Sequence, residues 1–125
     1  MGWYAPWPLD PEKCVWDFAS GKPLLISEFG GEALYGQSGS EDIASSWSEE
    51  YQERLYRDNL AMMSRIPNLA GISPWVLYDF RSPFRFHPLN QDGWNRKGLV
   101  GDRGDRKKAW HVMHDFYMSK KNGAQ

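Results

Sequence analysis

The sequence predicts an α/β fold in which parallel strands alternate with helices. Residues 23–29 form a short apolar run without polar alternation, which is typical of a strand buried on both faces of a parallel sheet, and residues 69–77 are a second strand candidate. Helices are predicted before, between and after these two segments, over residues 10–19, 46–65 and 107–118, from helix start signals or from apolar residues at helical spacing. This alternation of helix and strand favours βα units.

Each predicted helix has a start signal or an apolar stripe. Asp10-Pro11-Glu12 places an acidic N-cap before a first-turn proline, and Ser46-Trp47-Ser48-Glu49 has the pattern of a capping box. The row Trp47, Tyr51, Leu55 is expected to pack in the core. The last helix begins at Lys107, and the polar tail, residues 119–125, is expected to be frayed.

Both long loops, residues 30–45 and 78–101, follow strands rather than helices. In β/α barrels the chemistry lies on the loops after the strands, and a barrel needs about 250 residues. Two strands cannot close one, and they would leave open sheet edges that favour aggregation. The sequence is therefore expected to be part of a barrel, or a chain that pairs with another.

Composition limits the partners and the compartment. A net charge of -1 leaves no field to gather nucleic acid or an anionic membrane surface, so neither partner is expected. The basic run 103–108 is expected to be a solvated helix start. No apolar stretch is long enough to span a membrane, and the first residues do not form a signal peptide, which favours a cytoplasmic or periplasmic location.

Cofactors and disulfides are not expected. The lone Cys14 excludes an internal disulfide, and His111 and His114 lack a third ligand for a metal. The 7 Trp residues fit a sugar-binding cleft or an aromatic core.

Glu28 is the first candidate for chemistry. It ends an apolar strand and precedes Phe29-Gly30-Gly31, so its carboxylate is expected at the mouth of a barrel, where it is partly desolvated yet reachable. The alternative is a helix cap or an ion-pair partner of an arginine. Arg81, Arg85 and His87 could line the same mouth or pair with acids such as Asp79.

Several segments, spanning residues 2 to about 118, resemble glycoside hydrolase family 2, the β-galactosidase and β-glucuronidase family. They are Gly2-Trp3-Tyr4, Ile26-Ser27-Glu28-Phe29-Gly30, Trp47-Ser48-Glu49-Glu50-Tyr51-Gln52, residues 75–80, Asn95-Arg96-Lys97-Gly98 and Lys107-Lys108-Ala109-Trp110. The resemblance implies the C-terminal portion of a TIM (β/α)8 barrel, about its last two βα units and a preceding helix. Residues 1–125 would then be part of the catalytic domain.

The resemblance also implies a retaining exo-β-glycosidase with Glu28 as nucleophile. The family's acid/base Glu ends the fourth strand, which this sequence does not contain, so the isolated chain is expected to be inactive. Glu32 has no aromatic or Asn neighbour to position it, and a loop or capping role is expected instead. The partners implied are a β-glycoside, the rest of the barrel and N-terminal β-domains.

Four residues are implied to bind substrate. Trp75 would stack on the sugar, and Tyr4 would lie near the nucleophile. Asn95 and Lys97 match a pair that binds the sugar carboxylate in β-glucuronidases, and an ammonium suits a uronate. A uronide is therefore favoured over a galactoside. The alternative for Trp75 is a place in the core, and the alternative for Lys97 is a solvated position in a loop.

Two other functions remain open at this stage. A small aromatic-rich carbohydrate-binding module would fit the composition, but such modules are mostly β-sandwiches. A non-catalytic fragment that complements an N-terminal partner would share the same ancestry.

Overall fold

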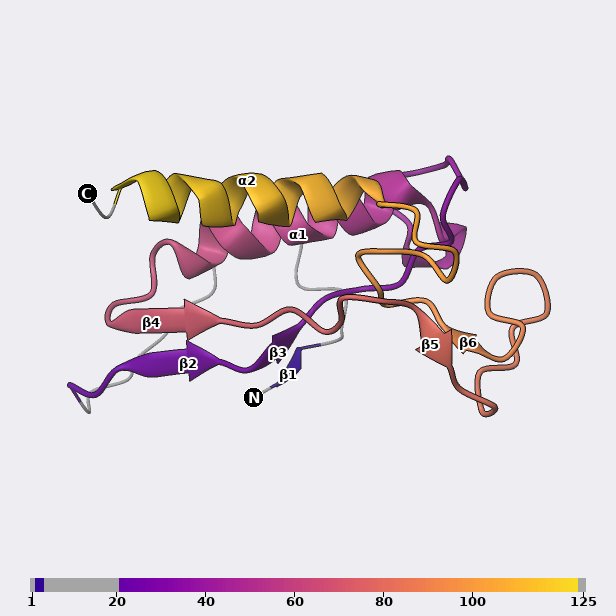
Figure 1. Ribbon diagram of the computed structural model, residues 1–125, viewed down its shortest axis with the longest axis horizontal. Coiled ribbons are helices and arrows are strands. Elements are labelled where there is room, and N and C mark those ends of the chain that lie inside the picture. The colour runs from indigo at the N-terminus through magenta and orange to yellow at the C-terminus, as the bar shows by residue number, and fades with distance from the viewer. Residues whose placement is uncertain (1, 4–20, 124–125) are drawn as a thin grey trace.

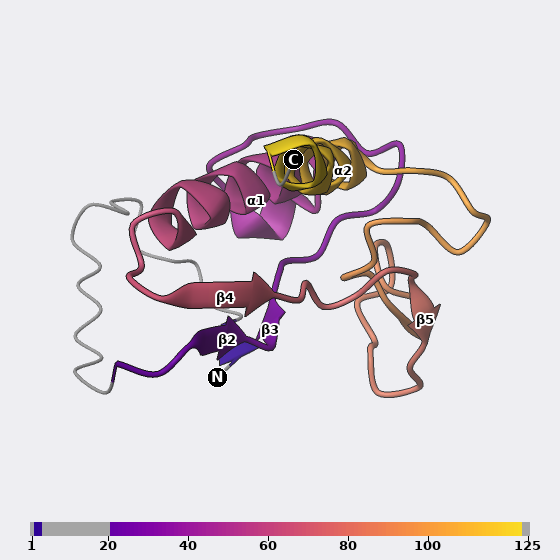
Figure 2. The same ribbon diagram turned by 60° about the vertical axis from the view of Figure 1, so that its left-hand side comes forward.

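Two layers of different kinds make up the fold: a pair of helices, and beneath it short strands (Figures 1 and 2). The computed structural model describes the backbone of residues 2–3 and all of residues 21–123. Helices α1 (Glu49–Met63) and α2 (Lys108–Gly123) pack against each other on one face of the strands. The helix expected over residues 10–19 lies outside the described residues.

The strands next to the helices are parallel, as predicted. β2 (Leu24–Ile26) pairs with β4 (Leu69–Ile72). β3 (Glu28–Phe29), which follows β2 along the chain, pairs with β1 (Gly2–Trp3). β5 (Phe80–Arg81) and β6 (Trp94–Asn95) form a small antiparallel pair. The arrangement is not the β-sandwich expected of a carbohydrate-binding module.

The strand predicted over residues 69–77 ends early, at Ile72. Pro74 has no N–H to donate, which interrupts the regular ladder. The chain nevertheless stays beside its neighbour, because Ser73 N donates to Ile26 O at 2.8 Å and Trp75 N donates to Phe29 O at 2.8 Å.

The core lies between the helices and the strands. Its buried residues are Ile26, Phe29, Tyr56, Met62, Met63, Ile66, Leu99, Ala109, Val112 and Met113. The rings of Phe29 and Tyr56 lie 5.4 Å apart. Gly30 follows with φ +148°, and a Cβ there would lie 2.7 Å from both Trp75 O and Tyr56 Oη. Only glycine therefore lets the tip of β3 pass this close to the helix layer.

The capping box predicted at Ser46 is wrong, because α1 is capped by Ser48. Ser48 is fully buried, and its Oγ accepts from Tyr51 N at 3.1 Å. Ser46 instead ends a 3-10 turn, Ala44–Ser46, and its Oγ lies 2.9 Å from Ser48 Oγ.

The expected core row Trp47, Tyr51, Leu55 is also corrected. Trp47 has φ 54° and stands outside the helix, so it does not continue the row. The most buried face of α1 instead includes Gln52 and Tyr56, and Trp47, Tyr51 and Leu55 line a pocket. Leu55 packs only against the margin of the core.

The frayed tail predicted from residue 119 is helical as far as Gly123. Lys120 and Lys121 lie in the last turn, where positive charge stabilises the end of a helix. Lys120 also lies over the ring of Phe116, with 5.4 Å between Nζ and the ring centroid. Within the described residues, no helix combines the length and the apolar character needed to cross a membrane.

The cap of α1 provides a test of this fold. Ser48→Ala should lower the free energy of unfolding by about 1–2 kcal/mol, because it leaves Tyr51 N without its acceptor in a buried place. Chemical denaturation would measure the change. Ser45→Ala, at an exposed neighbour, should change the free energy of unfolding by less than about 0.5 kcal/mol.

Candidate active site

Glu28 lies at the tip of a parallel strand, as predicted. It is half-buried in β3, opposite Gly2 of β1. The next residue, Phe29, accepts the backbone hydrogen bond from Trp75 N at 2.8 Å, so the chain at Trp75 runs directly beside the Glu28 strand. The peptide bond that follows, Trp75–Val76, is cis.

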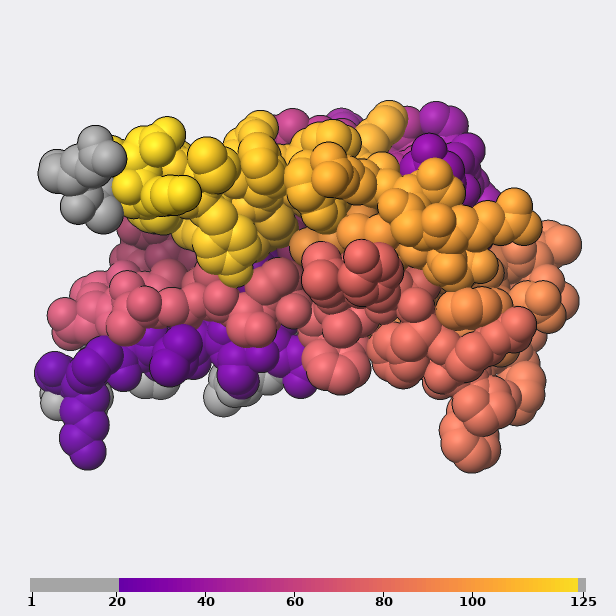
Figure 3. Space-filling view, in the orientation of Figure 1, coloured from indigo at the N-terminus to yellow at the C-terminus, as the bar shows by residue number. Residues whose placement is uncertain are grey.

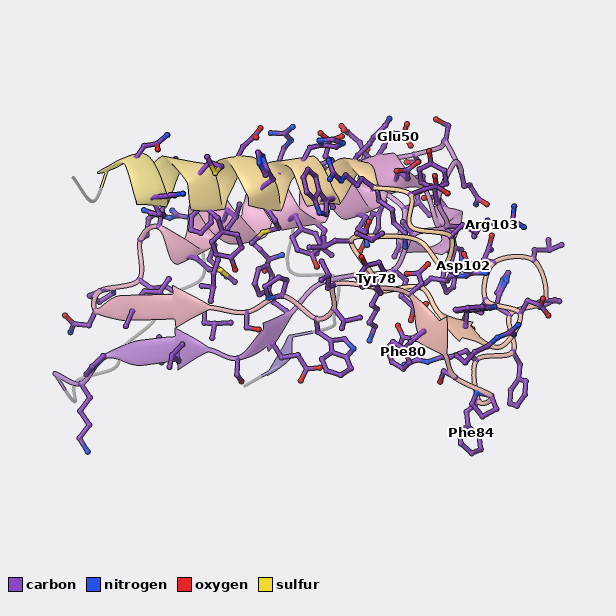
Figure 4. The ribbon with its side chains drawn as sticks, in the orientation of Figure 1. Glu50, Tyr78, Phe80, Phe84, Asp102 and Arg103 are labelled. Atoms are coloured by element: carbon purple, nitrogen blue, oxygen red, sulfur yellow. The ribbon has the colours of Figure 1, made fainter. Side chains whose placement is uncertain are left out.

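Trp75 is not a core residue. The residue is 39% exposed, and its ring meets that of Phe80 edge to face with 6.0 Å between centroids. Phe80 is exposed on the side of the strands away from the helices, and Phe84 stands on a loop that projects on that side (Figure 4). The segment after β5 projects on the same side in the space-filling view (Figure 3). An apolar, partly open surface therefore adjoins the tip of β3.

Lys97 is brought to the same place through its backbone. Its carbonyl oxygen accepts from Val76 N at 3.2 Å, which sets the backbone of Lys97 next to the Trp75–Val76 segment. Asn95 is 5% exposed, and its Oδ1 accepts from Lys97 N at 3.0 Å. The amide of Asn95 thus shapes the turn that carries Lys97.

The charge of Lys97 is sensitive to its surroundings. Burial lowers the pKa of Lys97, and the nearby charge of Arg85 acts in the same direction. The carboxylates of Glu32 and Glu28 raise this pKa, so they oppose the effect of burial. Lys97 therefore lies within electrostatic reach of both carboxylates.

Glu32 is held by two partners across the loop. Its Oε1 accepts from Arg85 Nη1 at 3.2 Å, and its Oε2 accepts from Gln91 Nε2 at 2.9 Å. Its side chain is only 14% exposed. Glu32, Arg85, Gln91 and Lys97 border a pocket of about 450 Å³.

The other residues of the long loop have separate contacts. Arg81 lies over the ring of Trp94 at 4.3 Å, and the rings of His87 and Trp47 are 5.5 Å apart. Tyr4 lies outside the described residues, so its expected place near Glu28 stays a prediction.

The histidines of α2 lie against Trp110. His111 and His114 are exposed and flank Trp110, whose ring stacks on that of His114 at 4.9 Å. Among residues 21–123, no group of three or more His, Cys, Asp or Glu side chains is placed to hold a metal ion.

Sequence reasoning missed a buried charge cluster made of Asp79, Arg96 and Lys107. Lys107, predicted at a solvated helix start, is fully buried, and its Nζ lies 2.9 Å from Asp79 Oδ1. Burial raises the pKa of Asp79 and lowers that of Lys107, while the opposite charge of each partner opposes the shift. The available signal was an acid placed just after an apolar run, the same pattern that identified Glu28.

Comparisons with known proteins show that the chain is similar to part of several larger β-glucuronidases and a β-galacturonidase. No protein-family model matches it. A β-glucuronidase of Streptococcus agalactiae is 30% identical over 111 residues, covering 83% of this chain and 18% of the relative. The structure of a GH2 β-galacturonidase from Eisenbergiella tayi bound to galacturonate matches with a TM-score of 0.66 and 33% identity, covering 79% of this chain and 17% of that one.

A second solved structure agrees. The β-glucuronidase of Ruminococcus gnavus matches with a TM-score of 0.68 and 25% identity, over 78% of this chain and 16% of that one. The chain thus spans less than a fifth of the length of each of these relatives. Over about 80% of its length, the chain is homologous to the β-glucuronidases and β-galacturonidases of glycoside hydrolase family 2, and it corresponds to a small part of these larger enzymes.

Proposed function

We propose that the chain is the nucleophile-bearing, C-terminal part of the barrel of a retaining exo-β-glycosidase that acts on β-uronides. The observation that carries the proposal is the meeting of three segments at one strand end. Glu28 lies in the short parallel strand β3, Trp75 is hydrogen-bonded to the next residue of that strand, Phe29, and the backbone of Lys97 is bonded to the residue after Trp75.

In this proposal Glu28 attacks the anomeric carbon and forms a glycosyl-enzyme ester. A second carboxylic acid, about 5–5.5 Å away, protonates the leaving oxygen and then activates water. Glu32 does not serve as that acid, because both of its oxygens accept from Arg85 and Gln91. The acid/base therefore comes from the rest of the barrel.

The surroundings of Glu28 favour a uronide over a galactoside. The Lys97 ammonium is a cation in a half-buried place, which suits a sugar carboxylate, and Asn95 fixes the turn beside it. In this proposal Trp75, which is partly exposed, stacks on the pyranose. Two relatives were solved with uronic ligands, galacturonate in one and uronic isofagomine in the other.

The remainder of the barrel is the partner that this arrangement requires. Leu25 and Leu77 are 68% and 53% exposed, although both belong to the strand layer or its continuation. Such apolar side chains at the edges of a parallel sheet need covering, and further strands of a barrel would cover them. The isolated chain is expected to lack activity because it lacks the acid/base.

The role of Glu28 can be tested in a chimera in which residues 21–123 replace the homologous segment of the R. gnavus β-glucuronidase. In an active chimera, Glu28→Gln should lower kcat on 4-nitrophenyl β-D-glucuronide at least about 10³-fold, because the amide cannot form the ester. Glu41→Gln, at an exposed loop carboxylate, is the matched control and should keep kcat within about twofold. Comparable kcat values for the Glu28→Gln and Glu41→Gln chimeras would rule out Glu28 as nucleophile.

The role of Lys97 can be tested with two substrates. Lys97→Met should reduce kcat/KM for the β-glucuronide about 100-fold, through the loss of a charge-assisted hydrogen bond, and should change that for the matching β-galactoside less than about threefold. Lys120→Met, at the far end of α2, controls for loss of charge. Equal losses on both substrates would contradict a contact with the sugar carboxylate.

The pH dependence of the same chimera follows from the lowered pKa of Lys97. Uronide binding needs the protonated Lys97 ammonium, which is present at neutral pH. Binding should therefore weaken as the pH rises through the pKa of Lys97, which lies below the ordinary lysine pKa of 10.5. KM for the glucuronide, measured against pH, should rise there, while KM for the galactoside should not. A glucuronide KM that is flat up to pH 10.5 would contradict the assignment.

A further inference from the structure

Asp79 and Lys107 form a fully buried ion pair that is bonded to the residues on both sides of Lys97. Both side chains are 0% exposed. The Lys107 ammonium donates to three acceptors: Asp79 Oδ1 at 2.9 Å, Ala33 O at 2.6 Å and Arg96 O at 3.0 Å. Since an ammonium has three hydrogens, its capacity is complete, and it ties together segments that are far apart in the sequence.

Asp79 extends the same network to Gly98. Its Oδ1 also accepts from Gly98 N at 2.9 Å, and its Oδ2 lies 3.4 Å from Arg96 Nη1. A Cβ on Gly98 would lie 2.2 Å from Asp79 N and 2.5 Å from Asp79 Oδ1. Only glycine therefore fits at position 98. Its lack of a side chain lets the backbone at Gly98 come close enough to Asp79 for the hydrogen bond from Gly98 N to Asp79 Oδ1.

Arg96 is anchored at both ends. Its carbonyl oxygen accepts from Lys107 Nζ and also from Ala33 N at 3.1 Å. Its guanidinium donates to Asn90 O at 3.1 Å and to Asp102 Oδ1 at 2.9 Å; Asp102 is labelled in Figure 4.

The two residues that flank Lys97 are therefore both held by the buried pair. Arg96 is bonded through its carbonyl, and Gly98 is bonded through its N–H. Ala33, which shares the Arg96 carbonyl, lies five residues after Glu28 on the same segment. The pair thus sets where the turn carrying Lys97 stands relative to the strand that carries Glu28.

The chemistry of the pair supports a positioning role over a purely stabilising one. Burying two charges costs solvation that their attraction recovers only with good geometry, and an apolar pair often serves a core as well. Here the side chains of Asp79 and Lys107 form their other hydrogen bonds with residues of the loops around the site: Ala33, Arg96 and Gly98. None of these bonds is made to α1 or α2, which supply most of the core.

We infer that Asp79 and Lys107 are positioning residues for the uronate contact, holding Lys97 at a set distance from Glu28. This inference rests on the proposed function for its meaning, but the clamp itself can be measured without activity.

The clamp is tested by amide hydrogen exchange on the full 125-residue chain. Lys107→Met removes all three bonds yet leaves Asp79 facing Arg96, and Gly98→Ala separates the backbones without changing any charge. In both variants, amides of residues 95–98 should exchange about tenfold or more faster, while those of α1 and α2 change less than about twofold. Lys108→Met, at the exposed neighbour that pairs with Glu50, should match the parent chain.

In a variant that keeps the far-ultraviolet circular dichroism of the parent chain, an equal acceleration of all amides would show a general structural role and overturn the inference, as would unchanged exchange over residues 95–98. If Lys107→Met unfolds the chain, the Gly98→Ala variant decides by the same criteria.

The consequence for binding is measured in the active chimera. Lys107→Met should raise KM for the glucuronide about tenfold, with kcat for either substrate and KM for the galactoside changed less than about threefold. Equal effects on the two substrates would overturn the link to the uronate. An inactive parent chimera would contradict the proposed function and leave the exchange result standing, so the two failures can be told apart.

Discussion

The arrangement of the candidate site depends on the buried contact between Lys107 and Asp79. This ion pair joins the segment after Glu28, the residue before β5 and the turn that carries Lys97. None of these segments has enough regular secondary structure to hold its own geometry, since the strands there are only two to four residues long. Side-chain to backbone bonds replace the hydrogen bonds that a longer ladder would supply.

The helix layer supports the same loops from the other side. Gln52, fully buried in α1, donates to Gly31 O at 2.9 Å and to Gly98 O at 3.1 Å, so it joins the same two loops from the helix side. Glu49 Oε1 accepts from Lys108 N at 2.9 Å and thereby links the start of α1 to the start of α2. Polar groups at the starts of both helices thus come together near the C-terminal ends of the parallel strands. In β/α barrels, the catalytic residues lie at this end of the strands.

Local sequence patterns predicted the parallel strands and the helices α1 and α2 correctly, but they misplaced the residues at which some of these elements begin or end. The unalternating apolar run around Glu28 and the parallel pairing were confirmed, because burial on both faces leaves a direct trace in composition. The start of α1 was misplaced by two residues, since Ser46 and Ser48 are equally good caps and only the left-handed turn at Trp47 decides between them. The pairing of Glu32 with Arg85 was open as well, because the two residues are 53 positions apart.

By itself the sequence determined the α/β class, Glu28 at a strand tip and the homology to glycoside hydrolase family 2, since these depend on residue type and local order. The tertiary structure alone decided which charges are buried. Lys107 stands in a run of basic residues that looks solvated, and it is buried because the chain folds Ala33, Asp79 and Arg96 around its ammonium. A buried charge is stable only with partners that fill its hydrogen bonds, and these partners lie 74, 28 and 11 residues away along the chain, beyond the reach of any local pattern.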